Sequence, residues 1–348
     1  MSIVKPQIEK ERKEVDIEEE IRPMKRQKVN FSLLESDIRE LMLPFQHEFM
    51  PVNCPNCSGE KGAEDFRKGS FSFSLCPDCG TVFVNPRPPK ELLDDFYSKS
   101  KAFHGFTESL IENEQGRVKH IFIPRAGVIL DFLRKVGQIK GELLEVGCSI
   151  GTMLSIFKEQ SDLNVFGVDP SPAALEVTRK RGLVVYPETI ERYNPGEKRF
   201  DVVLSFETIE HLFWPVEFVK KVNEVMNEGG YFIFSTPNYH GYDIMTLGRH
   251  YKRISAPFHL NYFNVGSIDV ILNLAGFKVV KKITPGILDL INVRKQIEAG
   301  DAPEVSEFTK YLLSSTSKET QDRFQRFLSH NCLSGHMLIF SRKVNSLR

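Results

Sequence analysis

The sequence predicts a doubly wound α/β fold with a mostly parallel sheet, preceded by a small cysteine-containing module. Short apolar strands alternate with helical patterns from residue 142 to residue 283, and this alternation is typical of a parallel sheet covered by helices on both faces. A buried strand, a small-residue turn and a helix start follow one another at 142–154. Four of the six cysteines form two C-x-x-C pairs before this region.

The predicted elements follow in a regular order. We expect strands at 142–146, 164–168, 183–186, 200–206 and 231–235, with helices at 172–181 and 216–225. A helix at 265–275 and a strand at 277–283 come next, and a helical insertion near 284–336 precedes a last strand at 337–343. Residues 91–348 are therefore predicted to form one large domain, with helices at 91–97 and 117–136 at its start.

Residues 1–45 are predicted to be a charged N-terminal extension with one short helix. Runs such as Glu9–Glu14 and Glu18–Glu20 offer little to a core, so we expect residues 1–30 to form a solvated or partly helical extension. The apolar spacing over 31–43 predicts an amphipathic helix that Pro44 ends. Further along, the proline-rich segment 85–89 is predicted to be a stiff linker because proline fixes φ.

The overall charge gives no general reason to bind nucleic acid or an anionic membrane. Lys and Arg number 46 and so do Asp and Glu, which leaves a formal net charge of zero. The N-terminus lacks an apolar stretch typical of a signal peptide, and no apolar run is long enough to span a bilayer. We therefore expect a cytoplasmic protein; the sequence does not indicate its oligomeric state.

The four paired cysteines, Cys54, Cys57, Cys76 and Cys79, predict a zinc ribbon over 46–90. Each C-x-x-C turn presents two thiolates to one point, and two such turns supply the four soft ligands that tetrahedral zinc requires. Four protein ligands leave no open position, so we expect the zinc to be structural. Two disulfides, or a redox or iron site, remain open as alternatives.

The turn after the first strand predicts a site for an adenosine-containing cofactor. Gly147 and Gly151 allow close approach of the backbone, and Asp169 follows the next strand, where an acid can accept bonds from ribose hydroxyls. NAD and S-adenosylmethionine both fit this arrangement. The turn lacks the third glycine of the dinucleotide pattern, and a sulfonium cofactor has no phosphate to bind, which favours S-adenosylmethionine.

Four motifs in order resemble those of class I S-adenosylmethionine-dependent methyltransferases. They lie at 145–151, 168–171, 200–212 and 227–238. Ser149 stands where the family's middle glycine usually lies. The resemblance implies a Rossmann-like, seven-stranded sheet that ends in an antiparallel pair formed by 277–283 and 337–343. It also implies the following cofactor-binding residues: Glu145, Gly147, Cys148, Gly151, Asp169, Pro170, Phe206 and Glu207.

The cysteine ribbon and two later segments resemble a narrower subfamily. Gly80–Pro88 and Ala256–Phe263 are similar to segments of zinc-ribbon methyltransferases associated with glycan and secondary-metabolite biosynthesis. This resemblance implies O-methylation of a small-molecule acceptor, namely a sugar, a nucleotide-sugar or a related hydroxylated compound.

Two histidines are candidates for the general base that removes the acceptor proton. Histidine has the most suitable ordinary pKa for this task, and both His211 and His259 follow strands at the carboxyl edge of the sheet. We favour His259 because it lies in an irregular loop, whereas His211 begins a helix next to the cofactor strand. The alternative interpretation of each is a packing residue. Glu207 and Glu210 are expected to be structural or to lie near the cofactor.

Other functions remain open. The cofactor motifs also resemble those of enzymes that methylate quinone or phenolic precursors. RNA methylation is less favoured, because the fourth strand ends in Ser205–Thr208 rather than in the N/D-P-P-Y tetrad that binds an exocyclic amine. A non-catalytic scaffold that keeps the fold is the third alternative, and binding of cofactor without turnover of any acceptor would favour it.

Overall fold

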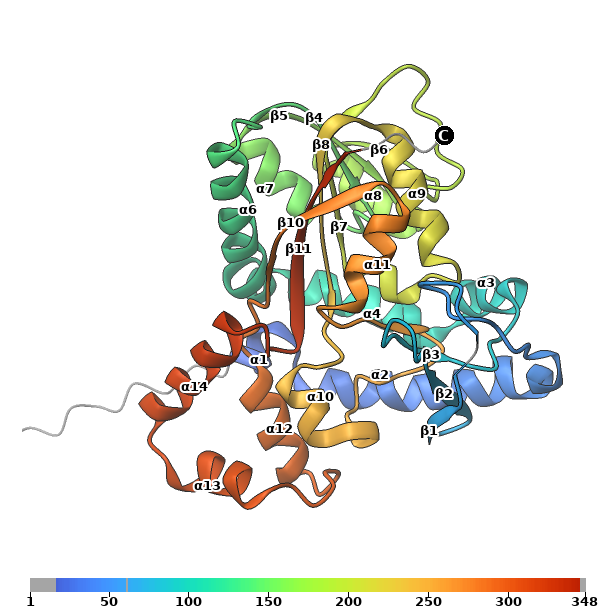
Figure 1. Cartoon of the computed structure of the whole chain (residues 1–348), viewed down its shortest axis with the longest axis vertical. Helices are drawn as coiled ribbons and strands as arrows, with labels where there is room; N and C mark the ends of the chain where they lie inside the picture. Colours follow the sequence, from blue (N-terminus) through green and yellow to red (C-terminus); the bar gives the residue numbers. More distant parts are fainter. Residues whose placement is uncertain (1–16, 61, 345–348) are drawn as a thin grey trace, which may run out of the picture.

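A seven-stranded sheet forms the centre of the molecule (Figure 1). The computed structural model describes residues 17–60 and 62–344, so the charged run Glu9–Glu14 lies outside the described residues. The strand order is β10-β11-β8-β7-β4-β5-β6. These strands are β4 (Lys140–Val146), β5 (Asp162–Val168), β6 (Val184–Tyr186), β7 (Phe200–Phe206), β8 (Met226–Pro237), β10 (Phe277–Ile283) and β11 (His336–Lys343).

The sheet confirms the predicted fold class. Strands β8, β7, β4, β5 and β6 pair in parallel, and β11 pairs antiparallel with both β8 and β10. The predicted antiparallel pair at the sheet edge is therefore present. The strand predicted at 231–235 is longer than expected, because pairing with β11 extends β8 to Pro237.

Helices cover both faces of the sheet. Leu143 and Leu144 are neighbours on β4, and their side chains enter two different apolar cores because successive strand residues point to opposite faces. On one face lie α6 (Ile123–Lys135), α7 (Thr152–Gln160) and α8 (Pro172–Lys180). On the other lie α9 (Pro215–Val225) and α11 (Ser267–Leu274).

The described part of the N-terminal segment is helical, which the prediction allowed, but it also contributes buried residues to a core, which we did not expect. It forms α1 (Ile17–Ile21), α2 (Met24–Asp37), a π-helical turn at Ile38–Met42 and a 3-10 helix at Leu43–Glu48. Thus the helix begins at Met24 rather than at residue 31, and Pro44 lies inside the 3-10 helix. Leu34 and Met42 are buried in a third apolar core, which they share with the ribbon.

Three further helices connect this segment to the sheet domain. They are α3 (Lys90–Lys99), α4 (Lys101–Glu112) and α5 (Glu114–Arg117). The sequence patterns did not predict α4, which packs against α2. The carboxylate of Asp37 on α2 accepts hydrogen bonds from Ser100 Oγ (2.7 Å) and Ala102 N (2.8 Å) at the start of α4. In Figure 1, α1, α2 and α4 lie below the edge at which β8 ends.

The cysteine module shares a sheet with the large domain. Strands β1 (Glu64–Lys68), β2 (Phe71–Leu75) and β3 (Val82–Val84) form an antiparallel sheet whose fourth strand is β9 (Asn261–Tyr262). The expected linker also contributes to this contact, because Arg87 is fully buried and donates to Phe213 O (2.6 Å) and Asn261 Oδ1 (2.7 Å). The segment therefore fixes the ribbon against the large domain instead of merely spacing the two.

Four more helices lie toward the C-terminus. Helix α10 (Tyr242–Leu247) follows β8 and packs against α12 (Asp289–Glu298). Helices α13 (Glu307–Ser315) and α14 (Lys318–His330) complete the segment between β10 and β11. Among the described residues, no helix has both the length and the apolar character needed to cross a membrane.

Candidate active site

The turn after β4 is a tight loop with three residues of positive φ. Gly147 (φ 75°), Ser149 (φ 47°) and Gly151 (φ 73°) adopt the left-handed region, so Ser149 tolerates the conformation that a glycine usually supplies. The amides of Gly147 and Cys148 donate to Val168 O at 2.8 and 3.2 Å, which holds the loop against the end of β5. Helix α7 begins directly after Gly151. The loop thus places a helix start at the carboxyl edge of the sheet, where ligands bind in open α/β folds.

Two acids flank this loop. Asp169 accepts hydrogen bonds from Ser149 N and Ser171 N, each at 2.8 Å, and burial raises its pKa. Glu145 is buried, and its Oε2 has no hydrogen-bond partner among the described residues. Burial and the charge of Asp169 raise the pKa of Glu145 well above its ordinary value. An amino group bound at the loop would satisfy Glu145, and each Asp169 oxygen retains a lone pair for a ribose hydroxyl, so these residues fit S-adenosylmethionine.

The remaining predicted cofactor residues play different structural parts. Cys148 is 4% exposed, and a Cβ built on Gly167 would lie 2.6 Å from its Sγ; its side chain therefore packs under the loop, and only its backbone can face a ligand. Pro170 is exposed directly after Asp169. Phe206 ends β7 beneath the guanidinium of Arg125, whose Cζ lies 5.1 Å from the ring centroid.

Glu207 stands at the centre of an ionic network that follows β7. Its Oε1 accepts from Ser235 Oγ (2.6 Å) and lies 3.5 Å from Arg125 Nη2, while its Oε2 lies 3.3 Å from His336 Nδ1. Burial alone would raise the pKa of this carboxyl, but the charges of His336 and Arg125 outweigh burial and hold it well below its usual range. Glu207 is therefore an anion at neutral pH.

Glu210 lies three residues after Glu207, and its pKa is shifted in the opposite direction. It is 1% exposed; Oε2 accepts from Thr236 Oγ1 (2.9 Å), and Oε1 has no hydrogen-bond partner among the described residues. Burial, strengthened by the charge of Glu207, raises the pKa of Glu210 well above its ordinary value. Its Oε1 lies 3.8 Å from His211 Nε2.

The structure brings the two predicted histidines together. The rings of His211 and His259 meet edge to face, with centroids 4.7 Å apart. Phe258 O lies 2.8 Å from His211 Nδ1; because a carbonyl only accepts, Nδ1 carries the proton and Nε2 keeps its lone pair. Burial lowers the pKa of His211, and burial together with His211 lowers that of His259 further. Both imidazoles are therefore neutral near pH 7, the form that accepts a proton.

Two residues of this site were missed at the sequence level. Arg125 lies within the helix α6, and His336 opens β11, more than a hundred residues after Glu207. The pairing of β11 with β8 offers the only signal for His336, because an antiparallel strand must begin at the edge where its neighbour ends.

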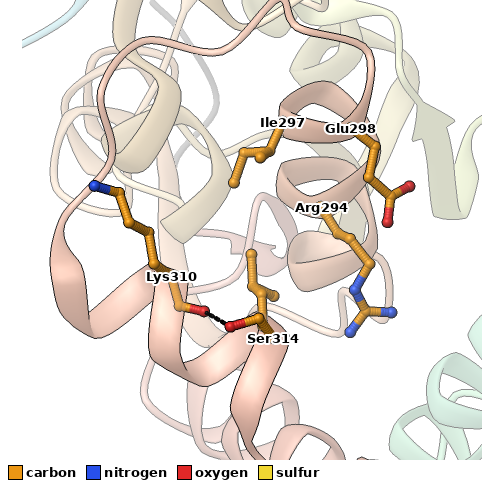
Figure 2. A pocket seen from close by; sticks show the side chains of 6 residues that line it. Arg294, Ile297, Glu298, Lys310 and Ser314 are labelled. Carbon is orange, nitrogen blue, oxygen red and sulfur yellow. Dashed lines mark hydrogen bonds between the residues drawn. The ribbon is translucent and has the colours of Figure 1, made fainter.

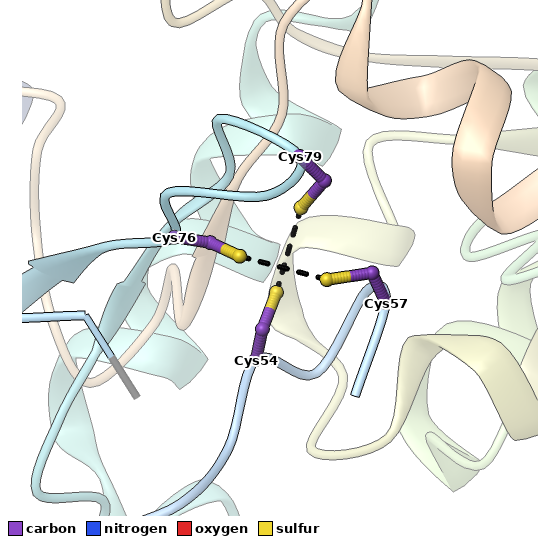
Figure 3. A group of neighbouring side chains, drawn as sticks. All are labelled: Cys54, Cys57, Cys76 and Cys79. Atoms are coloured by element: carbon purple, nitrogen blue, oxygen red, sulfur yellow. Dashed lines mark hydrogen bonds between the residues drawn. The ribbon is translucent and has the colours of Figure 1, made fainter. Parts of the chain in front are cut away.

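The four paired cysteines converge on one point (Figure 3). Cys54 Sγ lies 3.6 Å from Cys79 Sγ, and Cys57 Sγ lies 3.5 Å from Cys76 Sγ. Sulfurs bonded in a disulfide are only about 2.05 Å apart, whereas tetrahedral zinc with bonds of about 2.3 Å separates its sulfurs by about 3.8 Å. The backbone amide of Gly59 and the side chain of Asn56 point at the sulfurs of Cys57 and Cys79. This geometry is compatible with zinc and excludes the disulfide alternative in this conformation.

A separate hollow lies on the C-terminal helices, away from the predicted site residues. It has a volume of about 310 Å³ and is lined by residues of α12 and α13 (Figure 2). In Figure 2 the charged ends of Arg294, Glu298 and Lys310 point away from its centre. None of the predicted cofactor or catalytic residues lines this hollow.

The fold and the loop define a Rossmann-like domain whose glycine-containing loop lies at the carboxyl ends of β4 and β5. Residues 120–282 match the family described as "Methyltransferase domain". The matched segment contains the loop, both flanking acids and the histidine pair. This part of the chain is therefore similar to methyltransferase domains.

Three curated relatives share this part of the chain. A probable S-adenosylmethionine-dependent methyltransferase of Mycolicibacterium smegmatis is 29% identical over 40% of this chain and 52% of its own length. A carboxy-S-adenosyl-L-methionine synthase of Campylobacter curvus is 27% identical over 42% and 65%. A ubiquinone biosynthesis O-methyltransferase of Alkalilimnicola ehrlichii is 35% identical over 31% and 47%. The chain therefore spans about half to two thirds of the length of each of these relatives.

Proposed function

We propose that this chain methylates a hydroxyl group of a small acceptor, with S-adenosylmethionine as the methyl donor. The acceptor class that the ribbon and the segment 256–263 favour is a sugar, a nucleotide-sugar or a related hydroxylated compound. The observation that carries the proposal is the position of the neutral pair His211 and His259 at the same sheet edge as the loop at 147–151. When bound, S-adenosylmethionine supplies an electrophilic methyl group on a sulfonium sulfur.

His211 is the better placed of the two histidines to take the acceptor proton. Its tautomer is fixed by Phe258 O, so that Nε2 is free to accept. The pKa of His259 is lowered more strongly, which makes it the weaker base. We therefore assign proton removal to His211 and the orientation of its ring to His259, which reverses the preference drawn from loop position. Glu207, held by Arg125, supplies a fixed negative charge that favours the protonated imidazole.

Zinc is proposed as the structural ion of the ribbon. All four cysteine sulfurs lie within 4.8 Å of one another, and their side chains point toward one another in Figure 3. With four thiolates bound, no position remains for a substrate. The ribbon would then act by holding β9 and the adjoining segment that carries Phe258 and His259.

The function is tested by binding and then by turnover. S-adenosylhomocysteine should bind the full chain in calorimetry, and NAD should not. In assays with labelled S-adenosylmethionine and a panel of nucleotide-sugars, His211→Ala should lower kcat by about 10²–10⁴-fold at unchanged cofactor affinity. His240→Ala, an exposed histidine, is the matched control. The wild-type rate should rise with pH through a pKa below the ordinary 6.5 of histidine.

Three outcomes would contradict this assignment. Normal turnover by His211→Ala together with loss in His259→Ala would exchange the two roles. If turnover disappears with chelators and returns with a divalent cation, a metal ion rather than a histidine base would be responsible for activating the acceptor. Binding of S-adenosylhomocysteine without turnover of any acceptor would favour the scaffold alternative.

A second acceptor class has one observation in its favour. The 35% identical relative is a ubiquinone biosynthesis O-methyltransferase, which makes a phenolic acceptor the alternative. A catechol included in the same panel separates the two: methylation of the catechol and of no sugar would select the phenolic class.

A further inference from the structure

Three arginines from distant segments act electrostatically on one another, and one of them also acts on His259. Arg22 Nη2 and Arg253 Nη2 lie 3.9 and 3.8 Å from the same oxygen, Glu18 Oε1. Arg117 ends α5, and its charge acts on both of the other arginines. The charge of Arg253 also acts on His259. The arginine cluster, defined as Arg22, Arg117 and Arg253, therefore adjoins the candidate active site.

The cluster has fewer carboxylates than cations. Glu18, 5% exposed, also faces Lys295 Nζ at 3.1 Å, so one carboxylate is shared among several cations. Glu207 also acts on Arg117, but it already faces Arg125 and His336, and Asp243 already accepts bonds from Tyr251 and Asn292. Like charges in a partly desolvated site repel each other strongly unless an anion offsets them. The structure thus holds an excess of positive charge at this place.

The guanidinium groups also have unused hydrogen-bond donors. Nε of Arg22 and Nε of Arg117 are buried, and neither has a hydrogen-bond partner among the described residues. Burial and the charge of Arg253 lower the pKa of Arg22 to about 9; burial and the charge of Arg125 lower that of Arg117 to about 10. Both remain cations at neutral pH. Buried donors normally have acceptors, and oxyanions bind guanidinium groups in pairs of charge-assisted bonds.

The arginine cluster is held at a fixed place relative to the cofactor loop. Glu114, at the start of α5, accepts from Thr152 Oγ1 (2.6 Å) and pairs with both terminal nitrogens of Arg181 (2.7 and 2.8 Å). Thr152 is the first residue of α7, directly after the loop. Helix α1, which precedes Arg22, packs against α5. A ligand group on the cluster would therefore lie at a defined distance from the transferred methyl group.

We propose, on the basis of the methyl transfer proposed above, that the acceptor carries an oxyanion that Arg22, Arg117 and Arg253 bind while its hydroxyl faces the histidine pair. The oxyanion is a phosphate ester or a carboxylate, since both present the oxygen pairs that guanidinium groups recognise. A neutral acceptor would leave the excess positive charge of the arginine cluster without a counter-ion. The N-terminal segment thereby becomes part of the acceptor site through Arg22.

The test measures anion binding by the full chain saturated with S-adenosylhomocysteine. The probes are inorganic pyrophosphate, inorganic phosphate and citrate, titrated by calorimetry at constant ionic strength. Arg117→Gln and Arg253→Gln should each weaken binding of the tightest probe by about ten- to a hundredfold and leave the affinity for S-adenosylhomocysteine unchanged. Arg323→Gln, which removes an exposed arginine paired with Glu319 on α14, is the matched control and should bind like the wild type.

Each outcome decides the proposal. Tighter binding of pyrophosphate indicates a phosphate ester, and tighter binding of citrate indicates a carboxylate. Absence of binding by all three probes, or equal binding by the wild type and both cluster variants, overturns it. If a glutamine variant loses its fold, Arg117→Lys keeps the charge and should bind with intermediate affinity; wild-type affinity in that variant would contradict paired recognition. The chain could also bind the anions with the same dependence on the arginines and yet fail to bind S-adenosylhomocysteine. That result would contradict the proposed methyl transfer and still support the anion site.

Discussion

The proposed cofactor half and the proposed acceptor half of the site are built in different ways. The cofactor half consists of the loop at 147–151 and Asp169, which lie within one strand–helix–strand unit, and local backbone contacts hold them in place. The acceptor half draws Arg22, His211, His259 and His336 from four distant segments. A contiguous unit needs only its own turn geometry, whereas a site assembled from distant segments depends on every contact that holds those segments together.

This difference indicates which half of the site a given substitution should damage first. The ribbon supports the proposed acceptor half, because β3 pairs with β9 and Asn56 donates to Ser267 O (2.8 Å). We therefore expect changes in the ribbon to damage the acceptor half first and changes in the loop to damage the cofactor half first.

The largest effect is expected from removal of the proposed zinc. Cys54→Ser and Cys79→Ser should lower the zinc content from about one ion per chain to about zero, at a cost of several kcal/mol in stability, because structural zinc contributes directly to folding. Elemental analysis measures the content. Amide hydrogen exchange should accelerate at 71–84 and 261–262, while the strands β4 and β5 remain protected.

Cys332→Ser is the control, since Cys332 lies outside the cluster and should keep the zinc. Protein prepared without chelators that contains no zinc would contradict the metal assignment. Equal acceleration of exchange in β4 and in the ribbon would break the distinction between the two halves.

An intermediate effect is expected from the loop glycine. A Cβ at Gly151 would lie 2.5 Å from Thr178 Cγ2 at φ 73°, whereas a Cβ at Gly137 would meet nothing within 4 Å at φ 75°. Gly137→Ala should therefore lower the free energy of unfolding by about 1–2 kcal/mol, because alanine is strained in the left-handed conformation. Gly151→Ala should lower it by about 1–3 kcal/mol more, because of the added steric contact. Urea unfolding measures both, and calorimetry should show weaker S-adenosylhomocysteine binding only for Gly151→Ala. Equal costs would mean that Thr178 moves aside freely.

The smallest effect is expected from the two glutamates after β7, and it should have opposite signs. At pH 7, Glu207→Gln should destabilise the protein by about 1–3 kcal/mol, because it removes a charged acceptor from Arg125 and Ser235. Glu210→Gln should be neutral or stabilising, because at pH 7 the glutamate must take up a proton on folding and the amide need not. Urea unfolding from pH 4 to pH 8 measures both differences.

The pH dependence separates the two residues. The folded-state pKa of Glu207 is lowered, so its ionisation stabilises the folded protein above pH 4.5, the ordinary pKa. This stabilisation is lost as the pH falls below that value. The folded-state pKa of Glu210 is raised, so its contribution to the free energy of unfolding is complete below pH 4.5. This contribution is lost as the pH rises. Parallel curves for the two variants would contradict this difference.

The sequence by itself determined the sheet, the cofactor loop and the cysteine cluster of this protein. Alternating apolar strands and helices specify a parallel sheet, and both the loop and each C-x-x-C turn are set by residues only a few positions apart. The tertiary structure alone decided the rest: that α1 and α2 fold over the sheet edge, that Arg87 is buried, and that His336 reaches Glu207. These features arise between segments whose local patterns are unrelated, and such contacts form only when packing of the whole chain brings the segments together.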